Sequence, residues 1–399
     1  YECVYGADYV VTTMRVGQDL ARCMDEKIAL SYGVIGQETT GAGGFSYAMR
    51  SIPAMANCCE AIRKNTENAV VFNFTNPSGL VTQAMHDLGF SNVIGICDNA
   101  TGIKMDLSKA LGVDTTDIFV RIYGLNHLSW ADEVRIGEED ILYKLIGNDN
   151  FLQNFHQFEY FDRNLIKHLG RIPNGYLYYY YHREKALSNM LKSPKTRGEN
   201  ILEINREMLK KLVNIDIESN PGRGMDIFRE YMHKRESSYM QMEMGDNKTA
   251  LEQIDISSLG IEELSDTGKG VNIYEGYAGV AFNFIEAVKN NKPIDLALNV
   301  KNSGSIEGFD NDDIVEVTCI VDENGSRPVI IGQIPKDAYL LMKQIKYYEK
   351  LSINAIIERS RAKAVMALME NPLVASYSIA QNLVEEYIRL NESYTGEWK

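Results

Sequence analysis

Three short runs of β-branched and aromatic residues in the first hundred positions each end in polar side chains. They lie within residues 6–17, 68–79 and 91–102, and helix-like patterns separate them. Strands that alternate with helices predict parallel pairing in a doubly wound α/β sheet. Such sheets bind ligands in the crevice at the carboxyl ends of their strands. We therefore expect the polar ends of all three runs to face one site.

The chain of 399 residues is long for one hydrophobic core and fits two domains. Residues 127–141 and 314–332 are typical of antiparallel hairpin strands, the second with the turn "DENG", and amphipathic helices lie between and after them. We expect residues 1–125 to form the remainder of a Rossmann domain. Residues 126–399 are expected to form an α+β domain for substrate binding and oligomerisation.

A dinucleotide-binding sheet normally begins with a strand and a glycine-rich turn. This sequence opens instead on "YECVYGADYVV", which is typical of a middle strand, and "GAGGF" at residues 41–45 follows no strand. Either the first strands are missing from this sequence or the fold binds no nucleotide. We favour a missing start.

The formal net charge is −14, and no basic block is present, which argues against a nucleic-acid surface. No apolar run is long enough to span a bilayer, and no secretory leader precedes Tyr1. The six cysteines form no CxxC pair, as expected of reduced thiols. These features predict a cytoplasmic protein that binds neither nucleic acid nor membrane.

Cys97 and His127 each follow an apolar strand-like run, and together they would suit a borderline divalent ion. Metal binding would keep the thiol deprotonated. Taken alone, Cys97 is better interpreted as a buried cysteine at a strand end. Asp98 can either cap the following helix or donate a proton to a leaving group, and the two interpretations are even.

Other polar residues near the predicted strand ends are less specific. Asn76 opens a rigid Asn-Pro turn that can hydrogen-bond a ligand hydroxyl or serve the turn alone. Arg15 and Arg22 can grip a phosphate through their planar forks or simply face solvent. The tyrosines of residues 172–185 favour a packed or intersubunit face over a cofactor site.

Six segments together resemble the NAD- and metal-dependent family 4 of the glycoside hydrolases, nearest its 6-phospho-β-glucosidase members. They are "YGVIGQETTGAGGFSYAMRSIP", "NFTNPSGLVTQAM", "VIGICDNATGIK", "YGLNHLSW", "NSGSIEGFDNDDIVEV" and "YAGVAFNFIEAV". The resemblance covers most of the chain and implies a Rossmann domain followed by an α+β domain, similar to lactate and malate dehydrogenases. The family is an exception to the two-carboxylate rule for glycosidases.

The resemblance implies hydrolysis of a phosphorylated disaccharide or glycoside. NAD+ takes a hydride from C3 of the sugar, a base removes the C2 proton, the C1 oxygen leaves, water adds, and the hydride returns. A divalent metal, usually Mn2+, stabilises the enolate. The matching metal ligands are Cys97 and His127. The matching base is Tyr277, with Tyr274 as its rival and Lys269 as a potential supporting cation.

The remaining implied site residues follow from the same motifs. Arg22 matches an arginine that grips the sugar 6-phosphate, Glu38 matches a catalytic-site position, and Asn76 and Asn126 match substrate-binding positions. NAD would pass over the strand ends at Thr13, Met14, Asn73 and Thr75. Family members of this kind are expected to assemble as homodimers or homotetramers.

The anomer and the reaction class both have alternatives. The segments at residues 36–45 and 73–79 look β-like, whereas Asp98 beside Cys97 is typical of members that cleave α-glycosides. We prefer the β assignment and keep a 6-phospho-α-glucosidase as the alternative. A hydroxy-acid dehydrogenase on the same fold would need a His–Asp relay that the Cys97–His127 pair does not supply. A non-catalytic sugar-phosphate binding protein is the third reading, favoured only by the absent glycine-rich turn.

Overall fold

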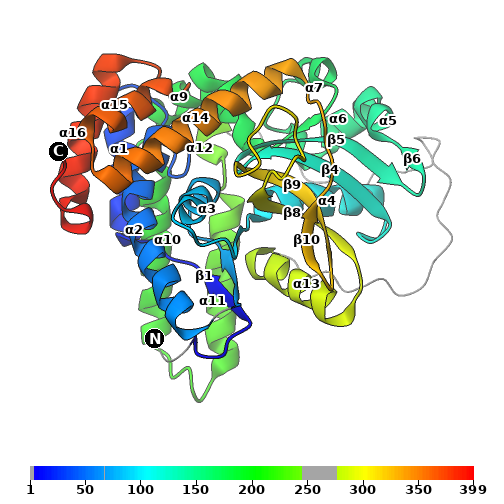
Figure 1. The fold of residues 1–399 in the computed structure, drawn as a ribbon, viewed down its shortest axis with the longest axis horizontal. Helices are drawn as coiled ribbons and strands as arrows, with labels where there is room; N and C mark the ends of the chain where they lie inside the picture. Colours follow the sequence, from blue (N-terminus) through cyan, green and yellow to red (C-terminus); the bar gives the residue numbers. More distant parts are fainter. Residues whose placement is uncertain (1–3, 67, 245–275) are drawn as a thin grey trace.

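The computed structural model describes residues 4–66, 68–244 and 276–399, without the side chains of His156 and Tyr277. Its larger sheet has six strands in the order β1-β2-β3-β8-β9-β10 (Figure 1). These strands are β1 (Tyr9–Thr12), β2 (Val70–Asn73), β3 (Val93–Gly95), β8 (Ile294–Lys301), β9 (Ile314–Asp322) and β10 (Gly325–Pro328).

The first three strands of this sheet are parallel, as the strand–helix alternation predicts. β1 pairs with β2 in the register Tyr9↔Val70, and β2 pairs with β3 in the register Val71↔Val93. Their connections contain α1 (Gln18–Ser31), α2 (Gly41–Asn65) and α3 (Ser78–Asp87). β3 then runs into α4 (Asp98–Leu111). The carboxyl ends of all three strands therefore lie at one edge, next to the start of α4.

The second half of the sheet is antiparallel and comes from late in the chain. β8 joins β3 at Gly95↔Asn299, and β9 pairs with β8 and with β10. The hairpin predicted at residues 314–332 is confirmed as β9 and β10. Strands on both sides of the expected domain boundary at residues 125/126 thus share one sheet, and that boundary stays a prediction.

The smaller sheet contains the hairpin predicted at residues 127–141, as its strands β5 (Leu128–Ile136) and β6 (Glu139–Asp140), and adds β4 (Ile118–Leu125) before it. β4 pairs antiparallel with β5, and only Asn126 and His127 form the turn between them. β5 also pairs with β6 and β7 (Ile172–Pro173). Thr318 on β9 joins the two sheets, because its hydroxyl accepts from Ile122 N at 2.8 Å and donates to Val120 O at 2.8 Å.

Helices cover both sheets. In Figure 1 the last helices pack against α1 and α2, whereas the marked N- and C-termini lie apart. The remaining helices are α5 (Leu142–Gly147), α6 (Asp149–Asn154), α7 (Arg163–Leu169), α8 (Tyr178–Tyr181), α9 (Arg183–Lys192), α10 (Arg197–Val213), α11 (Pro221–Ser237), α12 (Gln241–Met244), α13 (Gly276–Asn290), α14 (Lys336–Glu358), α15 (Arg361–Glu370) and α16 (Tyr377–Thr395). Two 3-10 turns are η2 (His156–Phe158) and η3 (Gly175–Leu177).

The tyrosine-rich segment is largely internal. Tyr178 and Tyr179 are almost completely buried within the chain, and Tyr176 is buried as well. The sequence analysis offered a packed face or an intersubunit face for this segment. These three rings pack within the chain itself. Among the described residues, none of the helices combines the length and the apolar character needed to span a bilayer.

Candidate active site

Cys97 and His127 come together at the edge where the parallel strands end. Cys97 precedes the first residue of α4, and His127 is the second residue of the β4–β5 turn. The Cys97 Sγ atom lies 3.4 Å from His127 Nε2, and both residues are 4% exposed. The structure therefore joins a thiol and an imidazole that are 30 positions apart in the sequence.

One backbone feature and two contacts fix the His127 ring. The backbone of His127 adopts a left-handed φ of 62°, which the two-residue turn imposes. The ring of Tyr176 stacks on it with centroids 3.8 Å apart and planes 4° apart. Nδ1 lies 3.0 Å from the Thr39 hydroxyl. The Nε2 atom is thereby aimed at Cys97.

Asn126 and Glu316 form the polar wall beside this pair. Asn126 Nδ2 donates to Glu316 Oε1 at 3.1 Å, and Asn126 Oδ1 accepts from Gly79 N at 3.3 Å. Ser129 and Asn299 also donate to the Glu316 carboxylate, at 2.8 and 3.2 Å. Burial nevertheless raises the pKa of Glu316 to about 6.

Burial keeps the thiol and the imidazole uncharged. Burial, with the negative charges of Glu316 and Asp98, raises the pKa of the Cys97 thiol well above its ordinary value. Burial lowers the pKa of His127 to about 3, against a weaker opposing effect of Glu38. At neutral pH the imidazole therefore offers a lone pair, and the thiol must lose a proton before it can bind a metal.

The Cys97–His127 pair fits a divalent ion as a partial ligand set. With bonds of about 2.3 Å to sulfur and about 2.0 Å to nitrogen, two ligands of one ion lie about 3.0 to 3.6 Å apart. The observed separation of 3.4 Å falls in this range. In the described part of the chain, no cluster of three or more His, Cys, Asp or Glu side chains could hold a metal. Two protein ligands would leave coordination positions open for substrate oxygens.

A group of arginines surrounds Glu38 nearby. One carboxylate oxygen of Glu38 pairs with Arg15, and the other lies 3.0 Å from Arg22 Nη1. Burial alone would raise the pKa of Glu38, but Arg22 and Arg15 lower it to about 2. Glu38 is therefore a carboxylate at any physiological pH and cannot donate a proton.

Two further arginines extend this group, which we call the arginine cluster: Arg15, Arg22, Arg197 and Arg235. Arg22 also pairs with Glu26, Nε to Oε1 at 2.9 Å. Burial lowers the pKa of both Arg197 and Arg235, and the positive charge of neighbouring arginines lowers it further. Crowded cations that depress one another's pKa favour an anion between them. The sequence interpretation included Arg15 and Arg22 but missed Arg197 and Arg235.

The predicted NAD positions differ in accessibility. Thr13 is exposed and Met14 is half-buried at the end of β1. Asn73 and Thr75 have no exposed surface. Asn73 Oδ1 accepts from Thr75 N at 2.9 Å, and Thr75 Oγ1 accepts from Met14 N at 3.2 Å. Asn73 and Thr75 therefore shape the strand ends, whereas Thr13 and, in part, Met14 keep exposed surface at the edge where such sheets bind dinucleotides.

The other predicted residues fall in three groups. Asp98 opens α4, with Oδ1 4.0 Å from Cys97 Sγ. Asn76 is half-buried and accepts from Ser78 N at 3.2 Å, as expected of the turn. Tyr277 stands in the first turn of α13, which packs against α4, but its side chain is outside the described residues, as are Tyr274 and Lys269.

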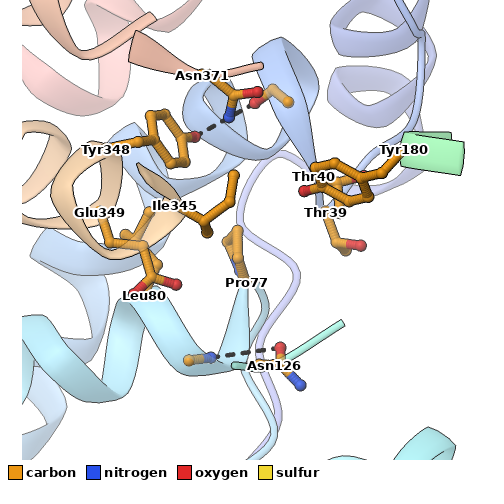
Figure 2. Close-up of a pocket in the computed structure, with 12 residues that line it drawn as sticks. Thr39, Thr40, Pro77, Leu80, Asn126, Tyr180, Ile345, Tyr348, Glu349 and Asn371 are labelled. Carbon is orange, nitrogen blue, oxygen red and sulfur yellow. Dashed lines mark hydrogen bonds between the residues drawn. The ribbon is translucent and has the colours of Figure 1, made fainter. Parts of the chain in front are cut away.

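A pocket is lined in part by Asn126 and Thr39. Figure 2 shows Asn126 at one end of it and Tyr348 and Asn371 at the other. Its lining residues are Thr39, Thr40, Gly41, Pro77, Gly79, Leu80, Asn126, Tyr180, Ile345, Tyr348, Glu349 and Asn371. The site is therefore backed by α14 and the α15–α16 connection, which no local sequence pattern indicated.

Two family models match successive parts of the chain. "Family 4 glycosyl hydrolase" matches residues 2–113, and "Family 4 glycosyl hydrolase C-terminal domain" matches residues 122–374. A protein described as a probable 6-phospho-beta-glucosidase of Bacillus subtilis is 30% identical over 97% of this chain and 80% of its own length. The maltose-6'-phosphate glucosidase of Clostridium acetobutylicum is 29% identical over 99% of this chain and 83% of its own.

Solved structures show the same similarity. The 6-phospho-beta-glucosidase of Thermotoga maritima, determined with manganese, NAD+ and glucose-6-phosphate, superposes with a TM-score of 0.77 at 28% identity. A 6-phospho-alpha-glucosidase from gut microorganisms, determined with NAD and glucose-6-phosphate, gives a TM-score of 0.73 at 26% identity. The matches cover 99% and 100% of this chain and 83% of each of the two structures.

Proposed function

This chain belongs to the family 4 glycosyl hydrolases, and we propose that it hydrolyses 6-phospho-β-glucosides with NAD and Mn2+ as cofactors. The observation that carries the proposal is the buried Cys97–His127 pair, 3.4 Å apart, at the carboxyl edge of the parallel strands. The arginine cluster beside it supplies the charge that a substrate phosphate needs. The relatives described above act on, or were solved with, phosphorylated sugars.

Each part of the site has a distinct task in this reaction. When bound, NAD would supply the hydride acceptor and donor, and the divalent ion would supply a Lewis acid for the sugar oxygens. Cys97 and His127 would hold the ion. Asn126, fixed by Glu316 and Gly79, is placed to orient a sugar hydroxyl.

The arginine cluster binds the 6-phosphate. Arg22 is fixed by Glu26 and Glu38, while Arg15 and Arg235 retain partial exposure and can meet the ligand. Because Glu38 stays ionised, it orients these guanidinium groups and accepts a hydrogen bond. It does not act as a general acid.

Two residues carry the proton transfers. Tyr277 takes the C2 proton once C3 is a ketone, for which its phenol needs a neighbouring positive charge to lower its pKa from about 10. Asp98 would donate a proton to the C1 oxygen as the leaving group departs, for which its carboxyl must first be protonated. Water then adds at C1, and no pair of carboxylates flanking C1 is needed.

A 6-phospho-α-glucosidase is the second candidate, and Asp98 beside Cys97 is the observation that favours it. Elimination breaks the C1 bond only after C2 is activated, so both anomers are chemically accessible. A direct comparison of p-nitrophenyl β- and α-glucoside 6-phosphates, with the full-length protein, NAD+ and Mn2+, separates the two.

Faster release of p-nitrophenolate from the β substrate, with both cofactors required and no net NADH formed, is the expected result. Faster cleavage of the α substrate would assign the second candidate. Net accumulation of NADH would contradict a glycosidase and indicate a dehydrogenase.

Assembly, domain roles and location are part of the same proposal. Exposed apolar residues at helical spacing, Leu209 with Val213 on α10 and Met225 with Phe228 on α11, support a homodimer or homotetramer. Light scattering should give two or four times the mass of one chain.

With a domain boundary at residues 125/126, Cys97 would come from the first domain and His127 from the second, so the proposed site would contain residues of both domains. The five described cysteines are free thiols, which supports a cytoplasmic location.

A further inference from the structure

A single side-chain oxygen organises the loop before α2. Gln37 Oε1 accepts from Thr39 N at 2.6 Å and from Thr40 N at 2.8 Å. Two backbone N–H groups identify this atom as the amide oxygen, which has no hydrogen of its own. The hydroxyls of Thr39 and Thr40 each lie 3.0 Å from the same oxygen. In both contacts the hydroxyl is the donor, and the amide oxygen is shared among the four donors.

The Thr39 hydroxyl is thereby left with acceptor capacity only. A threonine hydroxyl has one hydrogen and two lone pairs, and its hydrogen is directed to Gln37. The Thr39 hydroxyl also lies 3.0 Å from His127 Nδ1. If Thr39 donated to His127 instead, two oxygens would face each other at 3.0 Å with no hydrogen between them. The hydrogen in the Thr39–His127 contact therefore belongs to Nδ1.

We propose that Gln37 and Thr39 are positioning residues that hold His127 in the Nδ1–H tautomer, so that the Nε2 lone pair faces Cys97 Sγ. The effect of this tautomer on metal binding rests on the metal site of the proposed function. Ligating histidines commonly donate their second N–H to a fixed acceptor, which sets the tautomer and ring orientation. Here the acceptor is a hydroxyl that Gln37 orients.

Packing prevents the ring from escaping this arrangement. His127 is 4% exposed, and Tyr176 lies parallel to it at 3.8 Å. A flipped ring would also bring a carbon toward Thr39 and remove its hydrogen bond. Control over the proton on His127 thus comes from a loop about 90 residues earlier in the chain.

Thr39 and Thr40 offer a matched pair of variants. Both residues are 8% exposed, both donate to Gln37 Oε1, and only Thr39 contacts His127. Thr39→Val and Thr40→Val therefore remove the same group from the same loop. Thr39→Ser keeps the hydroxyl and tests rescue, and Gln37→Met removes the acceptor that orients it.

The first measurement is 15N NMR of metal-free protein with labelled histidines, where His127 is identified by the signal lost in His127→Gln. The second is Mn2+ affinity from the EPR signal of free Mn2+. Wild type, Thr40→Val and Thr39→Ser should show Nδ1–H, whereas Thr39→Val and Gln37→Met should populate Nε2–H. Mn2+ affinity should fall about 10- to 100-fold in Thr39→Val and stay within about threefold in Thr40→Val and Thr39→Ser.

An unchanged tautomer and wild-type Mn2+ affinity in Thr39→Val would overturn the proposal. An equal loss in Thr40→Val would overturn it too, because the effect would then belong to the loop as a whole. If wild type bound no Mn2+, the metal site would fail, yet the NMR result on metal-free protein would still decide the role of Thr39.

Discussion

Burial acts in opposite directions on the two proposed metal ligands. It holds the His127 imidazole neutral and ready to bind, and it holds the Cys97 thiol protonated. Of the two ligands, only the cysteine must therefore lose a proton when the metal binds. Neither residue's sequence neighbours indicate this, because Thr39 and Tyr176, which contact His127, and Glu316, whose charge acts on Cys97, are distant in the chain.

Mn2+ binding should release one proton per ion between pH 6 and 8. The thiol is protonated and the imidazole neutral throughout this range, so affinity should rise about tenfold per pH unit. Calorimetry in buffers of different ionisation enthalpy measures the protons released. Release of no proton per ion would mean that Cys97 does not lose its proton on binding. Release of two protons would mean that a second group loses one as well. Cys97→Ser serves as the control.

Arg235→Ala should weaken binding of the phosphorylated substrate without unfolding the protein. No acidic side chain of the described residues forms an ion pair with Arg235, so its loss strands no buried charge. Loss of one charged hydrogen bond, about 1.5 to 3 kcal/mol, should raise KM about 10- to 100-fold. Arg229→Ala, on the exposed side of α11, is the matched control. An unchanged KM in Arg235→Ala would remove this residue from the phosphate site.

At the scale of elements, the sequence patterns predicted strands and turns well because those signals are local. The runs at residues 6–17, 68–79 and 91–102 are β1, β2 and β3, and the "DENG" turn joins β9 to β10. Tertiary contacts were not predictable in the same way. Thr39 meets His127 across 88 residues, and Arg235 interacts electrostatically with Arg22 and Glu38 from far earlier in the chain; no periodicity marks either residue.

The first turn of α2 should tolerate no side chain at Gly44. A Cβ there would lie 2.7 Å from the Thr39 carbonyl carbon, whereas a Cβ at Gly102 in α4 would meet nothing within 4 Å. Gly44→Ala should lower the unfolding free energy by about 1 to 3 kcal/mol and weaken Mn2+ binding by displacing Thr39. Gly102→Ala should be neutral or stabilising by about 0.5 to 1 kcal/mol. Urea unfolding and Mn2+ titration of both variants check this, and equal effects would contradict it.

At the scale of the whole molecule, the ends of the chain are tied together by a buried polar network. Arg50 on α2 pairs with Asp25 on α1, Nη2 to Oδ2 at 2.6 Å, and donates to Asn391 on α16 at 2.7 Å. The mixed sheet adds a second link, because β8 pairs with β3. The sequence predicted the parallel strands and the late hairpin separately, and gave no sign that they form one sheet.

Arg50→Ala should destabilise the whole fold, because it leaves the Asp25 carboxylate buried without its partner. Breaking such a pair costs about 3 to 5 kcal/mol. Arg63→Ala, on the same helix, removes an exposed pair with Glu60 and should cost about 0 to 1 kcal/mol. Denaturant unfolding of the two variants measures both values. A loss in Arg50→Ala no larger than in Arg63→Ala would show that this network does not hold the two ends together.

The central claim is that one divalent ion binds between Cys97 Sγ and His127 Nε2. Anomalous scattering at the manganese edge from crystals grown with Mn2+ tests it most directly. We predict one strong peak within bonding distance of both atoms, and its loss in Cys97→Ser and in His127→Ala, both still folded by circular dichroism. A peak that is remote from this pair, or one that persists in either variant, would contradict the account.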